Sequence, residues 1–182
     1  MPKKIVLPEI GEQWDESTGE FFTIDNPVLI IEHSLKSLSK WEQIWHKPFI
    51  SMEEKTLEET ISYIKCMTLN EVDDRIYNFL TNDALKEIEA YIGDPMTATT
   101  INDTDQPRSR EVITAEILYY DLFTLGYSIE VENWHLNTLI ALIRVGSIKN
   151  SPQKKMSAFE AGIYQRRLNE QRRAQMAAKK KG

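Results

Sequence analysis

The most apolar part of the chain is residues 109–150, where hydrophobic positions recur near helical spacing. Ser109 is well placed as the N-cap of a first helix, and Gly126 as the residue that ends it. Residues 127–131 form a short connection, and a second apolar helix follows over residues 134–145. Because two apolar helices with so short a link pack against each other, we predict an antiparallel helical hairpin at the centre of the core.

The residues before this hairpin carry the pattern of further helices. Residues 35–45 place apolar side chains at the i, i+3, i+7 and i+10 positions of one helix face. Thr56 and Glu59 have the spacing of a capping box, which predicts that a helix begins directly after Thr56. Two more helices are predicted over residues 70–80 and 84–92.

The N-terminal residues show short apolar runs rather than helical spacing. Strands are predicted over residues 3–7, 20–24 and 28–31, with a turn over residues 15–19 that contains Asp, Ser and Gly. We expect a small β-hairpin or a three-stranded sheet. Because such a sheet is only marginally stable alone, it must pack on the helices or on another copy of the protein.

After residue 150 a polar break is followed by good helix formers with a sparse apolar face. We predict a basic C-terminal helix that packs at its start and is exposed towards its end. The predicted fold class is therefore mainly α, a helical bundle of about five to seven helices with the small N-terminal β segment. Its parts are an N-terminal β segment (residues 1–32), a helical core domain (residues 33–150) and a basic C-terminal helix or tail (residues 151–182).

Charge is divided unevenly along the chain. The formal net charge is −6, but residues 151–182 hold nine Lys or Arg residues and two acidic residues, which gives +7 there and −13 for residues 1–150. An acidic body with a basic tail points to an electrostatic partner for the tail. The candidate partner-binding residues are Lys154, Lys155, Arg166, Arg167, Arg172 and Arg173.

Three interpretations of this tail remain open. The first is an acidic surface on another protein or on a second copy of this one. The second is a solvated tail without a partner. Nucleic acid is the weakest, because the acidic body would repel it and the tail lacks interleaved aromatic residues for base stacking.

Composition argues against a membrane protein and against a disulfide-rich one. No apolar run approaches the roughly 18 residues that a membrane span needs, and the apolar run before Pro8 is too short for a signal peptide. The single Cys66 excludes an intrachain disulfide and a cysteine cluster for zinc. We therefore expect a protein of the cytoplasm.

Reaction chemistry is not evident in the sequence. It has no glycine-rich phosphate loop, no dinucleotide fingerprint and no pair of histidines spaced as metal ligands on one helix face. We predict no catalytic residue, no metal site and no cofactor, and we interpret the protein as a non-enzyme.

His135 is the residue nearest to an exception, because it begins an apolar helix opposite Glu116 and Asp121. A His–carboxylate pair could act as a general base. The favoured interpretation is structural, in which His135 and the neighbouring Trp134 tie two core helices together. His33 is interpreted as a turn or capping residue.

Residues 96–107 (MTATTINDTDQP) have no helical period and are rich in Thr, Asp and Asn. About twelve residues is near the upper limit for a plain connection in a compact domain. A functional loop and a surface connection remain equal alternatives.

Several segments, spread from about Ile5 to Arg173, carry a resemblance to a known family. They are EHSLKSLSKWEQIWHKPF, EETISYIKCMTL, PMTATTI, SREVITAEILYYDL, WHLNTLIALIRV and KNSPQKKMS. They resemble small proteins that are encoded among the structural genes of tailed bacteriophages and are known as tail assembly chaperones or virion-associated proteins.

The resemblance implies a function without chemistry. Tail assembly chaperones are helical proteins that bind the long tape-measure protein and help tail-tube subunits polymerise around it, in the host cytoplasm. The alternative is a structural component of the virion, such as a neck, connector or tail-completion protein. A third alternative is a nucleic-acid-binding phage protein that uses the basic tail, and self-association stays open.

Overall fold

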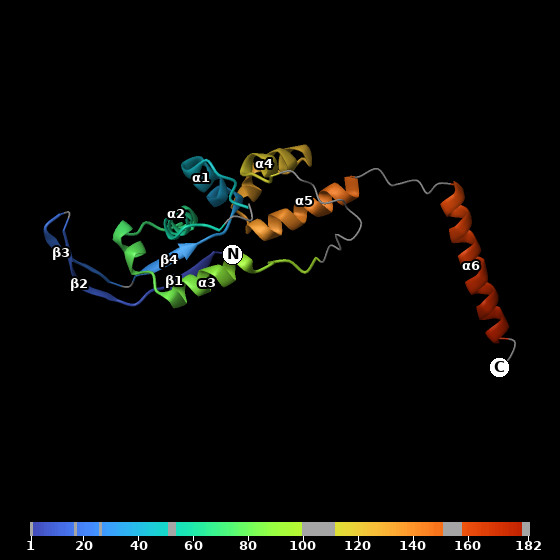
Figure 1. Cartoon of the computed structure of the whole chain (residues 1–182), viewed down its shortest axis with the longest axis horizontal. Coiled ribbons are helices and arrows are strands. Elements are labelled where there is room, and N and C mark those ends of the chain that lie inside the picture. Colours follow the sequence, from blue (N-terminus) through green and yellow to red (C-terminus); the bar gives the residue numbers. More distant parts are fainter. Residues whose placement is uncertain are drawn as a thin grey trace. The chain divides into compact units, whose positions relative to one another are not determined.

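The computed structural model describes residues 2–16, 18–25, 27–50, 54–99, 112–150 and 158–179 (Figure 1). They belong to two compact units, residues 1–149 and residues 150–182, and each unit is described by itself. The fold is mainly α with a small N-terminal β region, which confirms the predicted class.

The described N-terminal residues form four short strands in two antiparallel pairs. The strands are β1 (Lys3–Val6), β2 (Ile10–Asp15), β3 (Glu20–Ile24) and β4 (Val28–Ile31). β1 pairs with β4, and β2 pairs with β3 across the predicted turn, where Gly19 (φ 70°) donates its N–H to the Asp15 carbonyl at 2.8 Å. The prediction of one hairpin or one three-stranded sheet missed β2, because residues 10–15 are mostly polar and are held by backbone pairing with β3.

The helices before residue 94 are α1 (Leu35–Trp45), α2 (Leu57–Met67), the 3₁₀ helix η1 (Asp74–Phe79) and α3 (Asn82–Gly93). α1 spans the predicted residues. The capping box of Thr56 and Glu59 opens α2 as predicted, since each side chain accepts the other residue's backbone N–H. The predicted helix over residues 70–80 is a shorter 3₁₀ helix, in which the Asp73 side chain accepts the Arg75 N–H and favours a tight local turn.

The remaining helices are α4 (Ala115–Thr124), the 3₁₀ helix η3 (Ile129–Asn133), α5 (Leu136–Asn150) and, in the second unit, α6 (Ala158–Lys179). α4 begins later than predicted, because residues 112–114 are not helical; the predicted N-cap Ser109 lies outside the described residues. The N-cap residue Thr114 makes no side-chain cap bond. Instead, the Glu42 carboxylate of α1 accepts the Ala115 N–H at 2.7 Å and so fulfils the capping role.

Two hydrophobic clusters make up the core of the described residues, and α1 contributes to both. Trp41 is 1% exposed and packs in the cluster formed by β1, β4, α2, η1 and α3. Leu35 and Leu38 are fully buried in the other cluster, with α4 and α5. The predicted hairpin of residues 109–150 is therefore one side of the core rather than its centre. The element between the two clusters is α1, which packs on both α2 and α4 (Figure 1).

Candidate functional site

Residues 32–34 link β4 to α1 and are almost completely buried. The Glu32 N–H donates to the Met67 carbonyl at 3.0 Å, and the His33 carbonyl accepts the Leu136 N–H at 2.7 Å. This segment therefore joins the end of α2 to the start of α5. We refer to the side chains gathered around it as the polar cluster: Glu32, His33, Ser34, Tyr63, Tyr91 and His135.

Hydrogen bonds connect the polar cluster across four elements. His33 Nδ1 lies 2.6 Å from the Tyr63 hydroxyl of α2, and the Tyr91 hydroxyl of α3 donates to Glu32 Oε1 at 2.7 Å. The His33 and His135 rings meet edge to face, with centroids 5.1 Å apart. These side chains hold β4, α2, α3 and the start of α5 in one arrangement.

His135 uses both ring nitrogens for this purpose. Its Nδ1 accepts the Asn137 N–H at 3.3 Å, which leaves Nε2 to donate to the Tyr91 carbonyl at 3.2 Å. Neither nitrogen has a free lone pair with which to take a proton from a substrate. The partners that the sequence suggested, Glu116 and Asp121, are not the partners found.

Burial keeps both imidazoles neutral near pH 7. It lowers the pKa of His33 to about 3, with the neighbouring His135 contributing in the same direction. Burial also lowers the pKa of His135. Burial raises the pKa of Tyr91, and the hydrogen bond to Glu32 adds to this, so the phenol stays protonated. The cluster is thus a set of neutral groups around one carboxylate, which suits a structural role.

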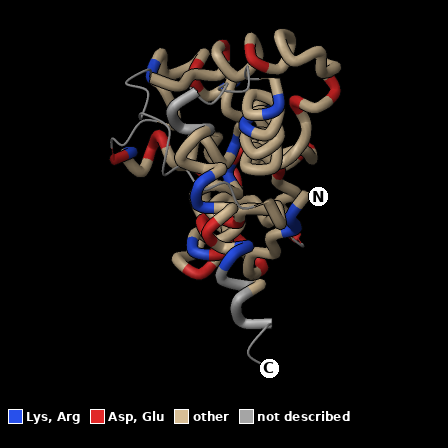
Figure 2. The backbone as a smooth tube through the Cα atoms, turned by 90° about the vertical axis from the view of Figure 1, so that its right-hand side faces the viewer, with Lys and Arg blue, Asp and Glu red and all other residues tan. Residues whose placement is uncertain are grey.

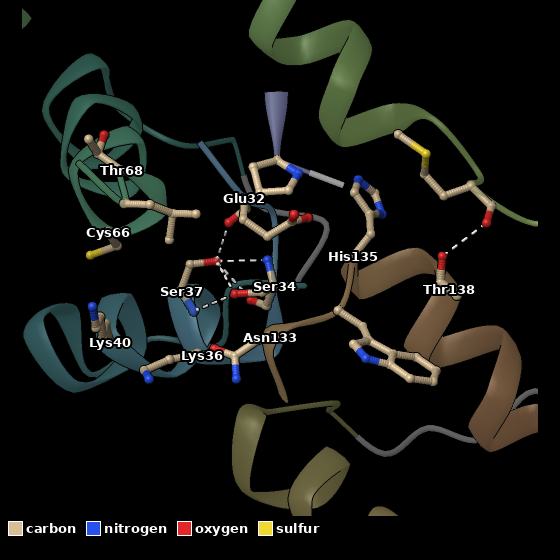
Figure 3. Close-up of a pocket in the computed structure, with 14 residues that line it drawn as sticks. Glu32, Ser34, Lys36, Ser37, Lys40, Cys66, Thr68, Asn133, His135 and Thr138 are labelled. Carbon is tan, nitrogen blue, oxygen red and sulfur yellow. Dashed lines mark hydrogen bonds between the residues drawn. The ribbon is translucent and has the colours of Figure 1, made fainter. Parts of the chain in front are cut away.

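A cavity of about 600 Å³ lies beside the polar cluster (Figure 3). Its polar lining is bonded to the fold itself: Ser37 Oγ donates to the Glu32 carbonyl at 3.2 Å, and Thr138 Oγ1 donates to the Met96 carbonyl at 2.9 Å. Burial raises the pKa of the lining Cys66 thiol, so it is not an activated nucleophile. Among the described residues, no group of His, Cys, Asp and Glu could hold a metal ion.

Trp134 does not fill the predicted role of a core tie, because 49% of its surface is exposed. Its backbone is extended, and successive side chains of an extended segment point to opposite sides. His135, which forms a β-bridge with Ser34, turns inward, so Trp134 turns outward to the rim of the cavity.

The predicted partner-binding residues of the tail divide into two groups. Arg166, Arg167, Arg172 and Arg173 lie on α6 and are exposed, and none of them forms an ion pair within the part of the chain that the structure describes. Lys154 and Lys155 lie outside the described residues.

An exposed aromatic surface on α4 was missed by the sequence interpretation. α4 buries Ala115, Leu118 and Leu122, but Tyr120 and Phe123 on its other side are 69% and 57% exposed. We call Tyr120 and Phe123 the α4 surface. The signal was present in the run ILYYDLF, because a helix that is apolar on every side must bury more than one face.

Comparison with known proteins gives no relative: no family model, no curated protein and no solved structure matches this chain. Within the described residues, no helix combines the length and the apolarity that crossing a bilayer requires.

Proposed function

We propose that this protein is a non-catalytic phage morphogenesis protein, a tail assembly chaperone that binds the tape-measure protein in the host cytoplasm. The observation that carries the proposal is the α4 surface, because Tyr120 and Phe123 are large aromatic side chains left in water on an apolar helix. The resemblance of six sequence segments to tail assembly chaperones supplies the class of partner.

The strength of this surface suits a chaperone. A long helical client exposes apolar stripes that can pack against an apolar helix face. Covering the exposed parts of two aromatic side chains removes roughly 200 Å² from water, worth about 5 kcal/mol before the costs of association. One such contact only about offsets the costs of association, so several contacts along a client must act together, and each is weak enough to release as the tail-tube subunits polymerise.

The polar cluster supports a function without chemistry. Its groups bind one another or the backbone, and His135 has both ring nitrogens occupied. A general base needs a lone pair that faces a substrate.

Co-expression with the tape-measure protein tests the proposal. We expect the tape-measure protein to stay in the soluble fraction and to co-purify with the chain. The Tyr120→Ser/Phe123→Ser variant should lose most of this capture while keeping its unfolding midpoint. The matched control is Ile44→Ser/Leu57→Ser, which removes two apolar side chains that are 60% and 67% exposed on α1 and α2. Equal capture by both variants would contradict a role for the α4 surface.

The main alternative is a structural virion component. It is favoured by the β2–β3 hairpin, because a two-stranded ribbon has edges to which a neighbouring subunit can add a strand. Quantitative mass spectrometry of purified virions separates the two functions. A chaperone is absent from the particle, and a neck or tail-completion protein is present in stoichiometric amount.

The third alternative is nucleic-acid binding through the arginines of α6. If the arginines neutralise DNA phosphates, the affinity for duplex DNA falls steeply as the salt concentration rises. We expect no salt-dependent shift of duplex DNA at micromolar protein.

A further inference from the structure

The β2–β3 hairpin is acidic as well as aromatic. Residues 9–25 contain no Lys or Arg. Their exposed carboxylates are Glu9, Glu12, Glu16, Glu20 and Asp25. None of these five forms an ion pair with any residue that the structure describes, although charged residues of both signs occur along the chain (Figure 2). Among the described residues, no basic side chain neutralises these five carboxylates.

One face of the hairpin is fixed to the body, which leaves the other face free. Arg75 of η1 lies over the Phe22 ring at 3.9 Å and pairs with Asp15 at 3.2 Å. On the opposite face, Trp14 and Phe21 pair edge to face with centroids 4.9 Å apart, and they are 53% and 63% exposed. We call this face the acidic hairpin face. Glu12 lies on it, two residues before Trp14, whereas Glu20 is paired with Asp15 on the fixed face.

α6 has the complementary properties. Arg166 and Arg173 are seven residues apart, so they lie on the same side of the helix, about 10 Å apart along its axis. Ile163, one turn before Arg166, is 46% exposed. Glu12 lies in β2 and Glu16 directly follows its last residue, so an extended path between them spans about 13 Å, a similar length.

We propose that the acidic hairpin face of one copy binds α6 of a second copy. Arginines pair with the hairpin carboxylates, and a guanidinium can also stack on Trp14, the aromatic side chain that attracts cations most strongly. Ile163 supplies an apolar contact for Phe21. The acidic hairpin face and α6 are thus complementary in charge and in apolar character.

A second copy is favoured over the same chain. Within the first unit, the β2–β3 hairpin and the end of α5 lie at opposite ends (Figure 1). α6 follows α5 in the sequence, whereas a second copy can present its α6 to the hairpin without that separation. Because the two contacting surfaces differ, the contact is head-to-tail and can continue from copy to copy. This self-association does not depend on the proposed function.

Sedimentation velocity of the full-length chain at several concentrations tests the proposal. We expect the average mass to rise with concentration, and the association to weaken when the ionic strength rises from about 0.05 M to about 0.5 M. The variants Glu12→Lys/Glu16→Lys and Arg166→Glu/Arg173→Glu should each raise the dissociation constant by about tenfold or more. Mixing the two variants should restore association, because the reversed hairpin of one matches the reversed helix of the other.

The matched controls reverse charges elsewhere on the body. They are Glu89→Lys/Glu130→Lys and Lys86→Glu/Lys149→Glu, which should leave the association unchanged. A monomer at every concentration would overturn the proposal, as would association that survives both paired variants. Loss of association in the Arg variant alone would also overturn it, because α6 would then bind another surface. A change of shape without a change of mass would show that α6 binds its own chain.

Discussion

The polar cluster and the two exposed surfaces distribute polarity in opposite ways. Around residues 32–34, ionisable and hydroxyl groups lie in the interior, each bonded to another group of the fold. On α4 and on the β2–β3 hairpin, large aromatic side chains lie in water beside the body that could have covered them. The first region places polar groups inside, and the second places apolar groups outside.

The comparison separates structural groups from binding groups. A buried polar group is stable only when it is bonded, so the polar cluster fixes how α2, α3 and α5 meet the β4–α1 link. An exposed aromatic pair contributes little to the stability of the folded monomer and gains more free energy when a partner covers it. Substitutions should therefore change stability in the first region and binding in the second.

The two tryptophans Trp41 and Trp14 give the largest expected contrast. Trp41 is 1% exposed and donates its indole N–H to the Glu59 carbonyl at 2.9 Å, so Trp41→Ala should lower the free energy of unfolding by about 3–5 kcal/mol. Trp14→Ala removes only the exposed edge-to-face pair with Phe21 and should change it by no more than about 1 kcal/mol. Urea denaturation followed by circular dichroism measures both values. A large loss for Trp14→Ala would mean that the hairpin aromatics stabilise the monomer.

Glu42 should give the next largest effect. Its carboxylate accepts the Phe49 N–H at 2.8 Å and the Ala115 N–H at 2.7 Å, and both bonds are lost in Glu42→Ala. We expect a loss of about 2–4 kcal/mol, and about half of that for Glu42→Gln, which keeps one acceptor oxygen. The exposed Glu58 of α2 is the control, and Glu58→Ala should change stability by less than about 0.5 kcal/mol. Equal values for Glu42→Ala and Glu58→Ala would exclude the long-range cap on α4.

Stability should also fall as the pH drops below about 6.5. The unfolded chain protonates His33 near pKa 6.5, but the folded chain does not until about 3, so protonation favours unfolding between these values. The contribution of His33 to the free energy of unfolding is fully present above the pKa of the unfolded chain. It decreases as the pH falls, by about 2 kcal/mol at pH 5. His135 acts in the same direction. The other titratable groups that face the two histidines are Glu32, Tyr63 and Tyr91, and the two phenols stay protonated over this pH range.

Urea denaturation at pH 7.5 and at pH 5 checks this dependence. The His33→Asn variant should be less stable at pH 7.5 but should lose less stability on acidification than the unmodified chain. The same loss in the variant and in the unmodified chain would show that other groups cause the pH dependence.

Local signals in the sequence predicted much of the fold. The spacing of apolar residues gave α1, the Thr56–Glu59 pair gave the start of α2, and Gly126 (φ 79°) ends α4 in the left-handed region as expected. Each of these signals lies within a few residues of the structure that it determines, so a single sequence contains it.

The features that the sequence missed depend on distant residues. α4 is capped by Glu42, 73 positions earlier, and no local pattern reveals that bond. His33 was interpreted as a turn residue, but Tyr63 and His135 make it part of the polar cluster. β2 forms because β3 pairs with it. Trp134 is exposed because the backbone is extended there and the side chain of the next residue, His135, points into the core.

The smallest expected change in stability belongs to the α4 surface. Tyr120→Ser/Phe123→Ser should shift the free energy of unfolding by no more than about 1 kcal/mol, because both side chains are mostly in water already. Urea denaturation beside the unmodified chain measures this shift. A larger loss would mean that the two aromatics are part of the core.

The amount of tape-measure protein that co-purifies with this variant shows whether the α4 surface binds the client. We expect capture to fall to background for Tyr120→Ser/Phe123→Ser and to stay at the level of the unmodified chain for Ile44→Ser/Leu57→Ser. Undiminished capture by the α4 variant, or no capture by the unmodified chain, would contradict this expectation.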